Sequence, residues 1–398
     1  MNFTWYIQRL GCMTFSEVPW RMYDKVVKLQ WQRRQVQDHS KDLPNLAVPT
    51  AVFGGAVSGF HTSEISETSL RKLLQSANEV VSGHWPVFHH TRTDMNPVPD
   101  WFLDPKTGLR SPNDSFAFDI DHRNEADIGN VKYVWELSRH HHLTLLATAY
   151  YLTREPKYAE CVARHLQSWL FNNPFLSGIH WTSGIEIGIR LISWVWIRRL
   201  LDDWPGRHDL FEGNAMFLSH LHHHQEYLMT FPSRGSSANN HLLAEACGLF
   251  MASCSFPYFR ESEMWRTRSA DILRREVPRQ TFLSGINKEL ATDYHGFVLE
   301  LCLAAALEGE VTKHPLDDAI WETIQQMTDS LAAMVDVTIR PPRQGDSDDG
   351  IGVLLDAPGV DRWQSLLATG QKLFGSCEWW PQISGGDIRT ALFSSLSK

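Results

Sequence analysis

Polar clusters recur at an almost constant spacing in this chain, each at the head of a long amphipathic segment. Four of them contain Trp135, Glu186, Asn240 and Tyr294, and a fifth contains Asp346. The intervals between these residues are 51, 54, 54 and 52 residues. Each interval holds a helical hairpin, and stacked hairpins form either an open solenoid or a closed ring. The polar residue types differ from repeat to repeat, as a single site at one mouth of a ring requires, and this favours the ring.

The segments between the clusters have helical periodicity. From residue 131 to about residue 338, apolar residues recur at i, i+3, i+4 and i+7, and the alternation typical of strands is almost absent. We therefore predict an all-α fold, an incomplete toroid of five or six α/α hairpins that forms a catalytic domain over residues 86–398. Residues 1–85 mix helical runs with turn signals, and we expect a smaller helical or irregular segment that packs on the toroid.

The composition excludes several classes of protein. The chain has 398 residues, of which 43% are hydrophobic and 21% charged, as in ordinary globular proteins. A net charge of −9 argues against nucleic acid as a partner. No apolar run approaches the length of about 20 residues that a transmembrane helix needs, and no secretory signal is visible. Six scattered cysteines without a CxxC pair predict reduced, buried thiols, and these features together indicate a cytoplasmic protein.

The sharpest local signal is the run SSANNHLLAE over residues 236–245. Asparagine is a favourable N-cap and an apolar run follows, so we expect Asn239 and Asn240 to open a helix at the rim of the ring. His241 then lies in the first turn, with Glu245 one turn below, where its carboxylate can hold the imidazole in one tautomer. The alternative is structural, a capping asparagine beside a half-buried histidine.

One repeat later, Tyr294 and His295 open the next predicted helix. An amide, an imidazole and a phenol at equivalent positions of adjacent hairpins suit β-elimination of a uronic acid. The amide of Asn240 can hydrogen-bond the carboxylate and stabilise the charge that develops when the C5 proton leaves. His241 or the phenolate of Tyr294 can take that proton, and a phenol can protonate the departing glycosidic oxygen.

Two other functions stay open at this point. A glycoside hydrolase needs two carboxyl groups that flank the glycosidic bond, and Glu186, Asp346 and Asp348 are candidates on the same toroid. A glycan-binding toroid without activity is the other alternative. Tyr294 also has a structural alternative: an amphipathic tyrosine that packs at the rim of the ring and has no catalytic role.

Five blocks of this sequence resemble the toroid domain of the heparinase II/III-like polysaccharide lyases. They are, in order, VKYVWELSRHHHL, WTSGIEIGIRLISW, NNHLLAEACGLF, GINKELATDYHGFVLE and GDSDDG. The resemblance implies lyase activity on an acidic polysaccharide: a heparin-like glycosaminoglycan, an alginate-like polymer or a bacterial exopolysaccharide. It also implies that Asn240 neutralises the uronate carboxylate, that His241 acts as base, and that Tyr294 acts as acid and, for one substrate epimer, as base.

The resemblance and the motifs together predict a lined substrate cleft. The residues expected to contact substrate are Trp135, Arg139, Glu186, Arg190, Asn239, Glu245 and His295.

Members of this family continue into a C-terminal β-sandwich that closes the cleft and supplies another histidine, often beside a metal. This sequence ends at Lys398. We therefore expect no metal or cofactor within this chain, and weak binding of acidic oligosaccharides with little or no elimination by the chain alone. A β-sandwich partner domain is expected to restore turnover. The family resemblance implies a periplasmic or secreted setting, in contrast to the cytoplasmic indication of the sequence.

The remaining motifs predict structural roles. The histidine runs at 140–142 and 222–224 lie on predicted helices, where adjacent side chains point in different directions, so we expect solvated or capping roles and not metal binding. The arginine pairs at 198–199 and 274–275 are expected on helix surfaces. The 345–350 run lacks the glutamate spacing of an EF-hand, and we expect a loop capped by aspartates.

Overall fold

The computed structural model of the chain describes residues 17–35, 52–57, 59–347, 350–375 and 377–397. Helices dominate these residues, as the hydrophobic periodicity predicts. A short antiparallel hairpin, β1 (Trp85–Val87) and β2 (His90–Arg92), precedes the main helices. Among the described residues, no helix combines the length and the apolar character that crossing a membrane requires.

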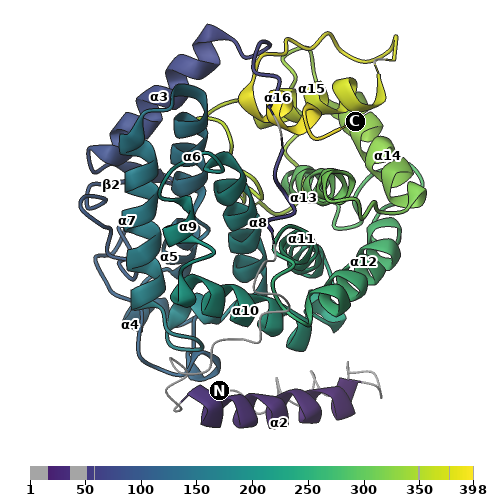
Figure 1. Cartoon of the computed structure of the whole chain (residues 1–398). Helices are drawn as coiled ribbons and strands as arrows, with labels where there is room; N and C mark the ends of the chain where they lie inside the picture. Colours follow the sequence, from purple (N-terminus) through teal and green to yellow (C-terminus); the bar gives the residue numbers. More distant parts are fainter. Residues whose placement is uncertain (1–16, 36–51, 58, 348–349, 376, 398) are drawn as a thin grey trace.

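The main helices form consecutive hairpins around a common centre (Figure 1). The described hairpins are α6 (His141–Thr153) with α7 (Pro156–Asn172), α8 (Gly184–Leu200) with α10 (Ala215–Thr230), α11 (Asn240–Ser255) with α12 (Ser262–Arg279), α13 (Thr292–Val311) with α14 (Asp318–Met334), and α15 (Arg362–Phe374) with α16 (Ile388–Ser394). Shorter elements connect them: η2 (Ala117–Asp119), α4 (Glu125–Ile128), α5 (Val131–Ser138), η3 (Ile179–Trp181), α9 (Arg207–Leu210) and η4 (Gly235–Ser237). This is the predicted α/α toroid.

Sequence pattern decides which helices lie inside. Helices α8, α11 and α13 are apolar on nearly all sides and are buried along almost their whole length, whereas α7 and α14 carry one apolar stripe and a polar outer face. Glycines allow the close approach of α8 to α11. A Cβ atom on Gly248 would lie 2.3 Å from the carbonyl oxygen of Gly188.

The inner helices α8, α11 and α13 point in the same direction, and their C-terminal ends meet at one mouth of the ring. There the guanidinium of Arg199 donates to the Glu308 carboxylate at 2.5 Å and to the Gly55 carbonyl at 2.7 Å. Ser255 donates to the same carboxylate, and its carbonyl accepts from Gly54 N–H at 2.8 Å. Segment 52–57, which turns at Gly54 and Gly55, thus lies at this mouth (Figure 1). The N-terminal ends of the three helices lie at the opposite mouth.

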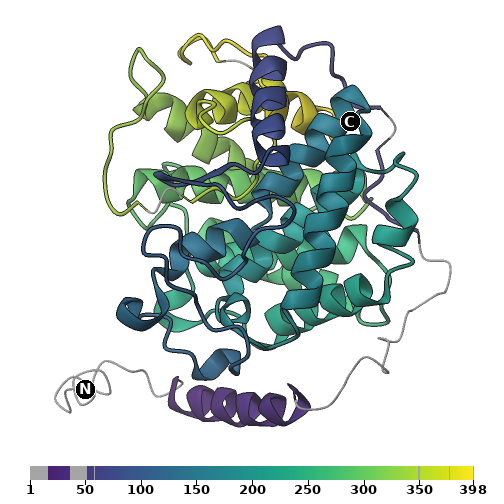
Figure 2. The same ribbon diagram turned by 90° about the vertical axis from the view of Figure 1, so that its left-hand side faces the viewer.

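The N-terminal part of the chain contacts the ring at two places. Helix α2 (Glu17–Gln35) lies against loops of the ring, where the Trp31 ring is 4.7 Å from that of Phe231. Helix α3 (Glu67–Val81) packs on α6 and α7. Its N-cap, Ser66, donates from its main chain to the Gly386 carbonyl at 3.0 Å, which joins α3 to the C-terminal hairpin (Figure 2). The domain division at residue 85 stays a prediction.

The first predicted helix is interrupted, and the histidine run within it is not solvated. His140 has a left-handed backbone conformation with φ 65°, which ends α5 and begins α6. His140, His141 and His142 are at most 2% exposed, because α6 is an inner helix with core on every side. The solvated or capping role predicted for this run is therefore wrong. The indole of Trp194 donates to the Nδ1 atom of His140 at 2.9 Å.

The prediction for one arginine pair is also wrong. Arg198 and Arg199 are buried at the end of an inner helix, where Arg198 pairs with Glu212 at 2.7 Å. Arg274 and Arg275, on the outer helix α12, have exposed side chains as predicted. The described thiols are free, and four of the five are buried: Cys161, Cys247, Cys254 and Cys302.

Candidate functional site

The N-terminal mouth brings together the starts of α8, α11 and α13. Peptide dipoles place partial positive charge at each of these ends, which favours a negatively charged ligand. Arg139, at the end of α5, binds the start of α8. Its guanidinium donates to both oxygens of Glu186 in the first turn of α8, at 2.7 and 2.9 Å. The same guanidinium lies 2.9 Å from Glu136. Burial raises the pKa of Glu136, but Arg139 and His141 outweigh it and keep the pKa below its usual value.

Asn239 and Asn240 open α11 as predicted. Asn239 is the N-cap, and its side-chain oxygen accepts from His241 N–H at 3.3 Å. Asn240 is the first helical residue, and its amide donates to Glu289 at 2.8 Å. Glu289 also accepts from the main-chain N–H of Asn240 at 3.0 Å and from the Asn239 amide at 3.1 Å. One carboxylate from the next hairpin therefore fixes both asparagines.

His241 is exposed at the start of α11, in a position that solvent and a ligand can reach. Glu245 lies one turn below and is buried, but its oxygens accept from the N–H and the hydroxyl of Ser233, both at 2.7 Å. Glu245 was predicted to hold the His241 ring. Its two oxygens instead bind Ser233 and so hold the connection 231–239. Burial raises the pKa of Glu245 to about 7, against the opposing effect of the two Ser233 bonds.

Tyr294 and His295 follow each other in the first turn of α13 but have opposite surroundings. The Tyr294 ring is half-buried, and its hydroxyl lies 3.5 Å from Asp346, which belongs to the predicted polar loop. His295 is 2% exposed, and its Nε2 atom lies 3.0 Å from the Met327 carbonyl. Burial lowers the pKa of His295 to about 4. The ring is buried against α14, and its contact with substrate stays a prediction.

Two further residues predicted to contact substrate, Trp135 and Arg190, also differ in burial. Trp135 is half-buried near the mouth, and its indole donates to the Ile179 carbonyl at 3.0 Å. Arg190 is fully buried; it donates to the Ser138 carbonyl at 2.7 Å and lies 4.4 Å from the Trp169 ring. It is one turn beyond Glu186 on an inner helix, and it therefore joins α8 to the end of α5 within the core.

The carboxylates proposed for hydrolysis are not arranged as a matched pair. Glu186 is buried with both oxygens bound by Arg139, whereas Asp346 is exposed beside Tyr294. Asp348 lies outside the described residues.

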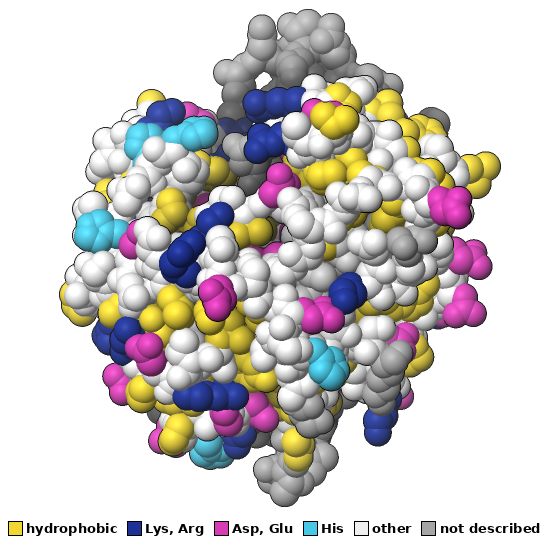
Figure 3. Space-filling model, turned by 90° about the horizontal axis from the view of Figure 1, so that it is seen from above, with side chains coloured by type: hydrophobic (Ala, Val, Ile, Leu, Met, Phe, Trp, Pro, Cys, Tyr) yellow, Lys and Arg dark blue, Asp and Glu magenta, His cyan; other side chains and the backbone are white. Residues whose placement is uncertain are grey.

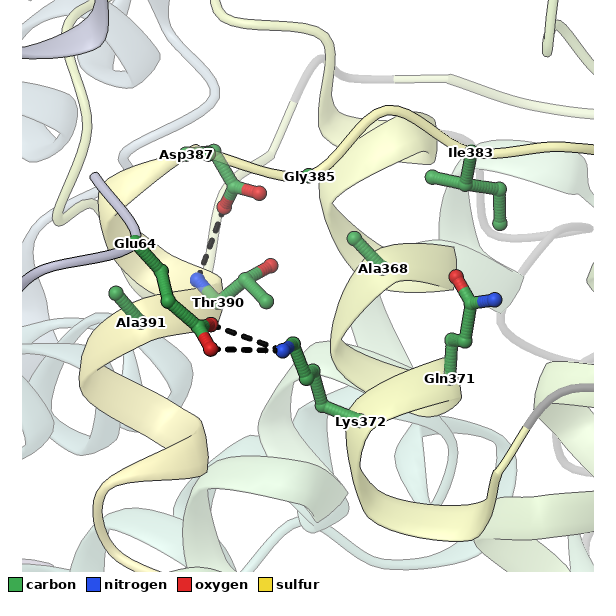
Figure 4. Close-up of a pocket in the computed structure, with 10 residues that line it drawn as sticks. Glu64, Ala368, Gln371, Lys372, Ile383, Gly385, Asp387, Thr390 and Ala391 are labelled. Atoms are coloured by element: carbon green, nitrogen blue, oxygen red, sulfur yellow. Dashed lines mark hydrogen bonds and ion pairs between the residues drawn. The ribbon is translucent and has the colours of Figure 1, made fainter. Parts of the chain in front are cut away.

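Other hollows and clusters lie apart from this mouth. A cavity of about 460 Å³ lies beside α15 and α16, where Glu64 and Lys372 form an ion pair at 2.9 Å (Figure 4). It contains none of the predicted site residues. On the outer helix α10, possible ligand atoms of His222, His223 and Glu226 lie within 4.8 Å of one another. Over the face in Figure 3, the described Lys and Arg side chains are interspersed with Asp and Glu and form no continuous basic stripe.

Sequence reasoning missed Glu289. The residue lies inside the GINKELATDYH block, five positions before Tyr294, so the block itself marked the region. Its partners are on another hairpin, however, and no spacing rule within one sequence connects residue 289 with residues 239–240.

Comparison with known proteins shows the family of the chain. Residues 96–349, which include every predicted site residue, match the sequence model described as heparinase II/III N-terminus. A heparin-sulfate lyase of Bacteroides stercoris is 27% identical over 203 residues, which are 46% of this chain and 30% of that protein. A heparin-sulfate lyase of Pedobacter heparinus is 24% identical over 227 residues, 54% of this chain and 32% of that protein. The matched regions thus span about a third of each relative.

Solved structures share the fold. Heparan sulfate lyase HepC from Pedobacter heparinus aligns with a TM-score of 0.50 and 20% identity, over 80% of this chain and 45% of that chain. A structure of heparinase III aligns with a TM-score of 0.54 and 19% identity, over 73% of this chain and 42% of that chain. Since the family model covers well over half of the sequence, the chain belongs to the heparinase II/III family.

Proposed function

We propose that the N-terminal mouth of the ring cleaves a uronic-acid-containing polysaccharide by β-elimination. The observation that carries the proposal is the placement of an oriented amide, Asn240, and a half-buried phenol, Tyr294, at the starts of neighbouring inner helices. The curated relatives named heparin-sulfate lyases support this reaction class, and they favour a heparin-like glycosaminoglycan over an alginate-like or exopolysaccharide substrate.

In the proposed reaction, the second N–H of the Asn240 amide donates to the uronate carboxylate. A base, Tyr294 as phenolate or His241, removes the C5 proton. The electron pair of the C5–H bond forms the C4=C5 double bond, and the C4–O bond breaks. The departing oxygen takes a proton from Tyr294 or His241, so the products are an unsaturated uronate and a new hydroxyl. The amide lowers the barrier because the carboxylate becomes more negative as the C5 proton leaves.

Hydrolysis on the same toroid is the second candidate, and the contacts of Glu186 argue against it. A hydrolase needs one carboxyl group as acid and a second as base or nucleophile, both facing the sugar. Glu186 gives both oxygens to Arg139.

A screen of the chain against heparan sulfate, other glycosaminoglycans, alginate and acidic exopolysaccharides tests the proposal. Elimination leaves an unsaturated uronate that absorbs in the ultraviolet, whereas hydrolysis produces only new reducing ends. We expect ultraviolet absorbance to rise with heparan sulfate or a related polymer. Reducing ends without absorbance would establish the hydrolase, and binding without either product would establish a glycan-binding toroid.

A further inference from the structure

Glu289 occupies an unusual position for a residue in a connecting turn. It comes from the loop before α13, yet all described hydrogen bonds of its side chain go to the start of α11. Its carboxylate accepts from the Asn240 main chain at 3.0 Å, from the Asn240 amide at 2.8 Å and from the Asn239 amide at 3.1 Å. The first N–H groups of a helix lack partners within the helix, so this carboxylate also caps the positive end of α11.

This carboxylate determines which way the Asn240 amide faces. The oxygen and the nitrogen of an asparagine amide occupy nearly the same space, so the neighbours decide which end points where. A carboxylate only accepts, and it would repel the amide oxygen. Glu289 therefore binds one N–H of the Asn240 amide and fixes the direction of the second N–H, the one that the proposed reaction needs.

The turn that carries Glu289 is itself fixed from α13. Asn287 is fully buried, its N–H donates to His295 Nδ1 at 3.3 Å, and its side-chain oxygen accepts from Glu289 N–H at 2.9 Å. Leu290 has φ 55°, a strained conformation for a bulky residue, which persists only where the surroundings impose it. The first turn of α13 thus holds Tyr294 directly and the Asn240 amide through His295, Asn287 and Glu289.

We infer that Glu289 is a positioning residue: it orients the Asn240 amide so that the amide can donate to the uronate carboxylate. His295 holds the turn that carries Glu289, through Asn287. This inference rests on the proposed function. It gives the buried His295 a role in holding the turn, in addition to the substrate contact predicted from the sequence.

Glu289→Gln tests the inference by kinetics. Glutamine keeps the size but turns one acceptor into a donor, which opposes the N–H groups of α11. We expect kcat to fall by about 10²-fold, as misplacement of a reacting group typically costs, with a smaller change in KM. In an Asn240→Ala background, the same change should have no further effect on kcat. The matched control is Glu212→Gln, a half-buried carboxylate that accepts from Arg198 at the C-terminal end of α8; it should leave kcat unchanged.

A second measurement does not depend on turnover. In ¹⁵N spectra of the chain, the side-chain amide signals of Asn240, identified by their loss in Asn240→Asp, should shift in Glu289→Gln and stay unchanged in Glu212→Gln. If Glu289→Gln does not fold, His295→Gln is the second variant. It removes the ring that accepts from Asn287 N–H in the same turn, and it should shift the same signals.

The outcomes separate the two proposals. If no polymer is cleaved, the proposed reaction fails, and the amide signals alone decide whether Glu289 orients Asn240. If the wild type eliminates and Glu289→Gln keeps its kcat, or if the Asn240 amide signals do not move, Glu289 does not position the amide and the inference is overturned.

Discussion

The phenol of Tyr294 carries proton transfer in the proposed reaction. Tyr294→Phe keeps the ring in its half-buried place and removes only the transferable proton. We expect kcat to fall by about 10²- to 10⁴-fold, the usual cost of losing a general acid or base, while binding of an acidic oligosaccharide survives. Ultraviolet assays and calorimetric titration measure the two quantities. Tyr23→Phe, an exposed tyrosine on α2, is the control and should change neither. Near-full activity of Tyr294→Phe would rule out the assigned role.

Single residues were predictable from the sequence where local signals determine their position. Asn240 opens a helix because asparagines precede an apolar run, and that information lies within a few residues. Arg190 and His295 were harder to place, because their burial depends on α8 and α13 being inner helices. Glu289 could not be found in this way, since its partners belong to a hairpin about 50 residues away.

At the scale of elements, the contact between α8 and α11 sets the position of the Asn240 helix. Gly248→Ala would place a methyl group 2.3 Å from the Gly188 carbonyl oxygen, so the two helices must separate. We expect a loss of about 1–3 kcal/mol in the free energy of unfolding, as for other overpacked cores. Denaturant unfolding measures it. Gly385→Ala, whose added methyl would meet nothing within 4 Å and whose φ is not positive, is the control and should be nearly neutral.

Helix periodicity predicted the hairpins but not every boundary. The 131–153 segment has the pattern of one continuous helix, and the structure divides it at His140 into α5 and α6. The break depends on His140 in the left-handed region, where only a few per cent of non-glycine residues lie, and the sequence does not distinguish His140 from the adjacent His141 and His142. For the same reason the first polar cluster, at Trp135, lies in a short separate helix, whereas those at Glu186, Asn240 and Tyr294 do lie at the starts of inner helices.

For the whole molecule, the buried histidines make stability depend on pH. Burial lowers the pKa of His165 to about 4 and that of His180 to about 3, and it holds the pKa values of His140, His142 and His224 well below the usual value. Below about pH 6.5 the unfolded chain binds protons at these positions and the folded chain does not. Stability is therefore fully present above pH 6.5 and is lost progressively as the pH falls toward the pKa values of the folded state.

The melting temperature between pH 7.5 and pH 5, recorded by circular dichroism at constant ionic strength, checks this expectation. Burial raises the pKa of Glu245 to about 7 and that of Asp356 to about 6, and these two groups act in the opposite direction, but the histidines outnumber them. We expect the melting temperature to fall steadily below pH 6.5. A constant or rising value over this range would mean that the imidazoles are not kept neutral by the core.

The central claim is that the N-terminal mouth performs elimination, and the chemical nature of the product tests it most directly. Mass spectrometry of oligosaccharides released from heparan sulfate after long incubation distinguishes the reactions, because an elimination product lacks the water that hydrolysis adds. We predict unsaturated uronate at the new non-reducing ends with the wild-type chain, and about 100-fold less or lower at equal incubation times with Asn240→Ala or Tyr294→Phe. Saturated products from the wild type, or unsaturated products at the wild-type level in both variants, would contradict the assignment of the reaction to this mouth.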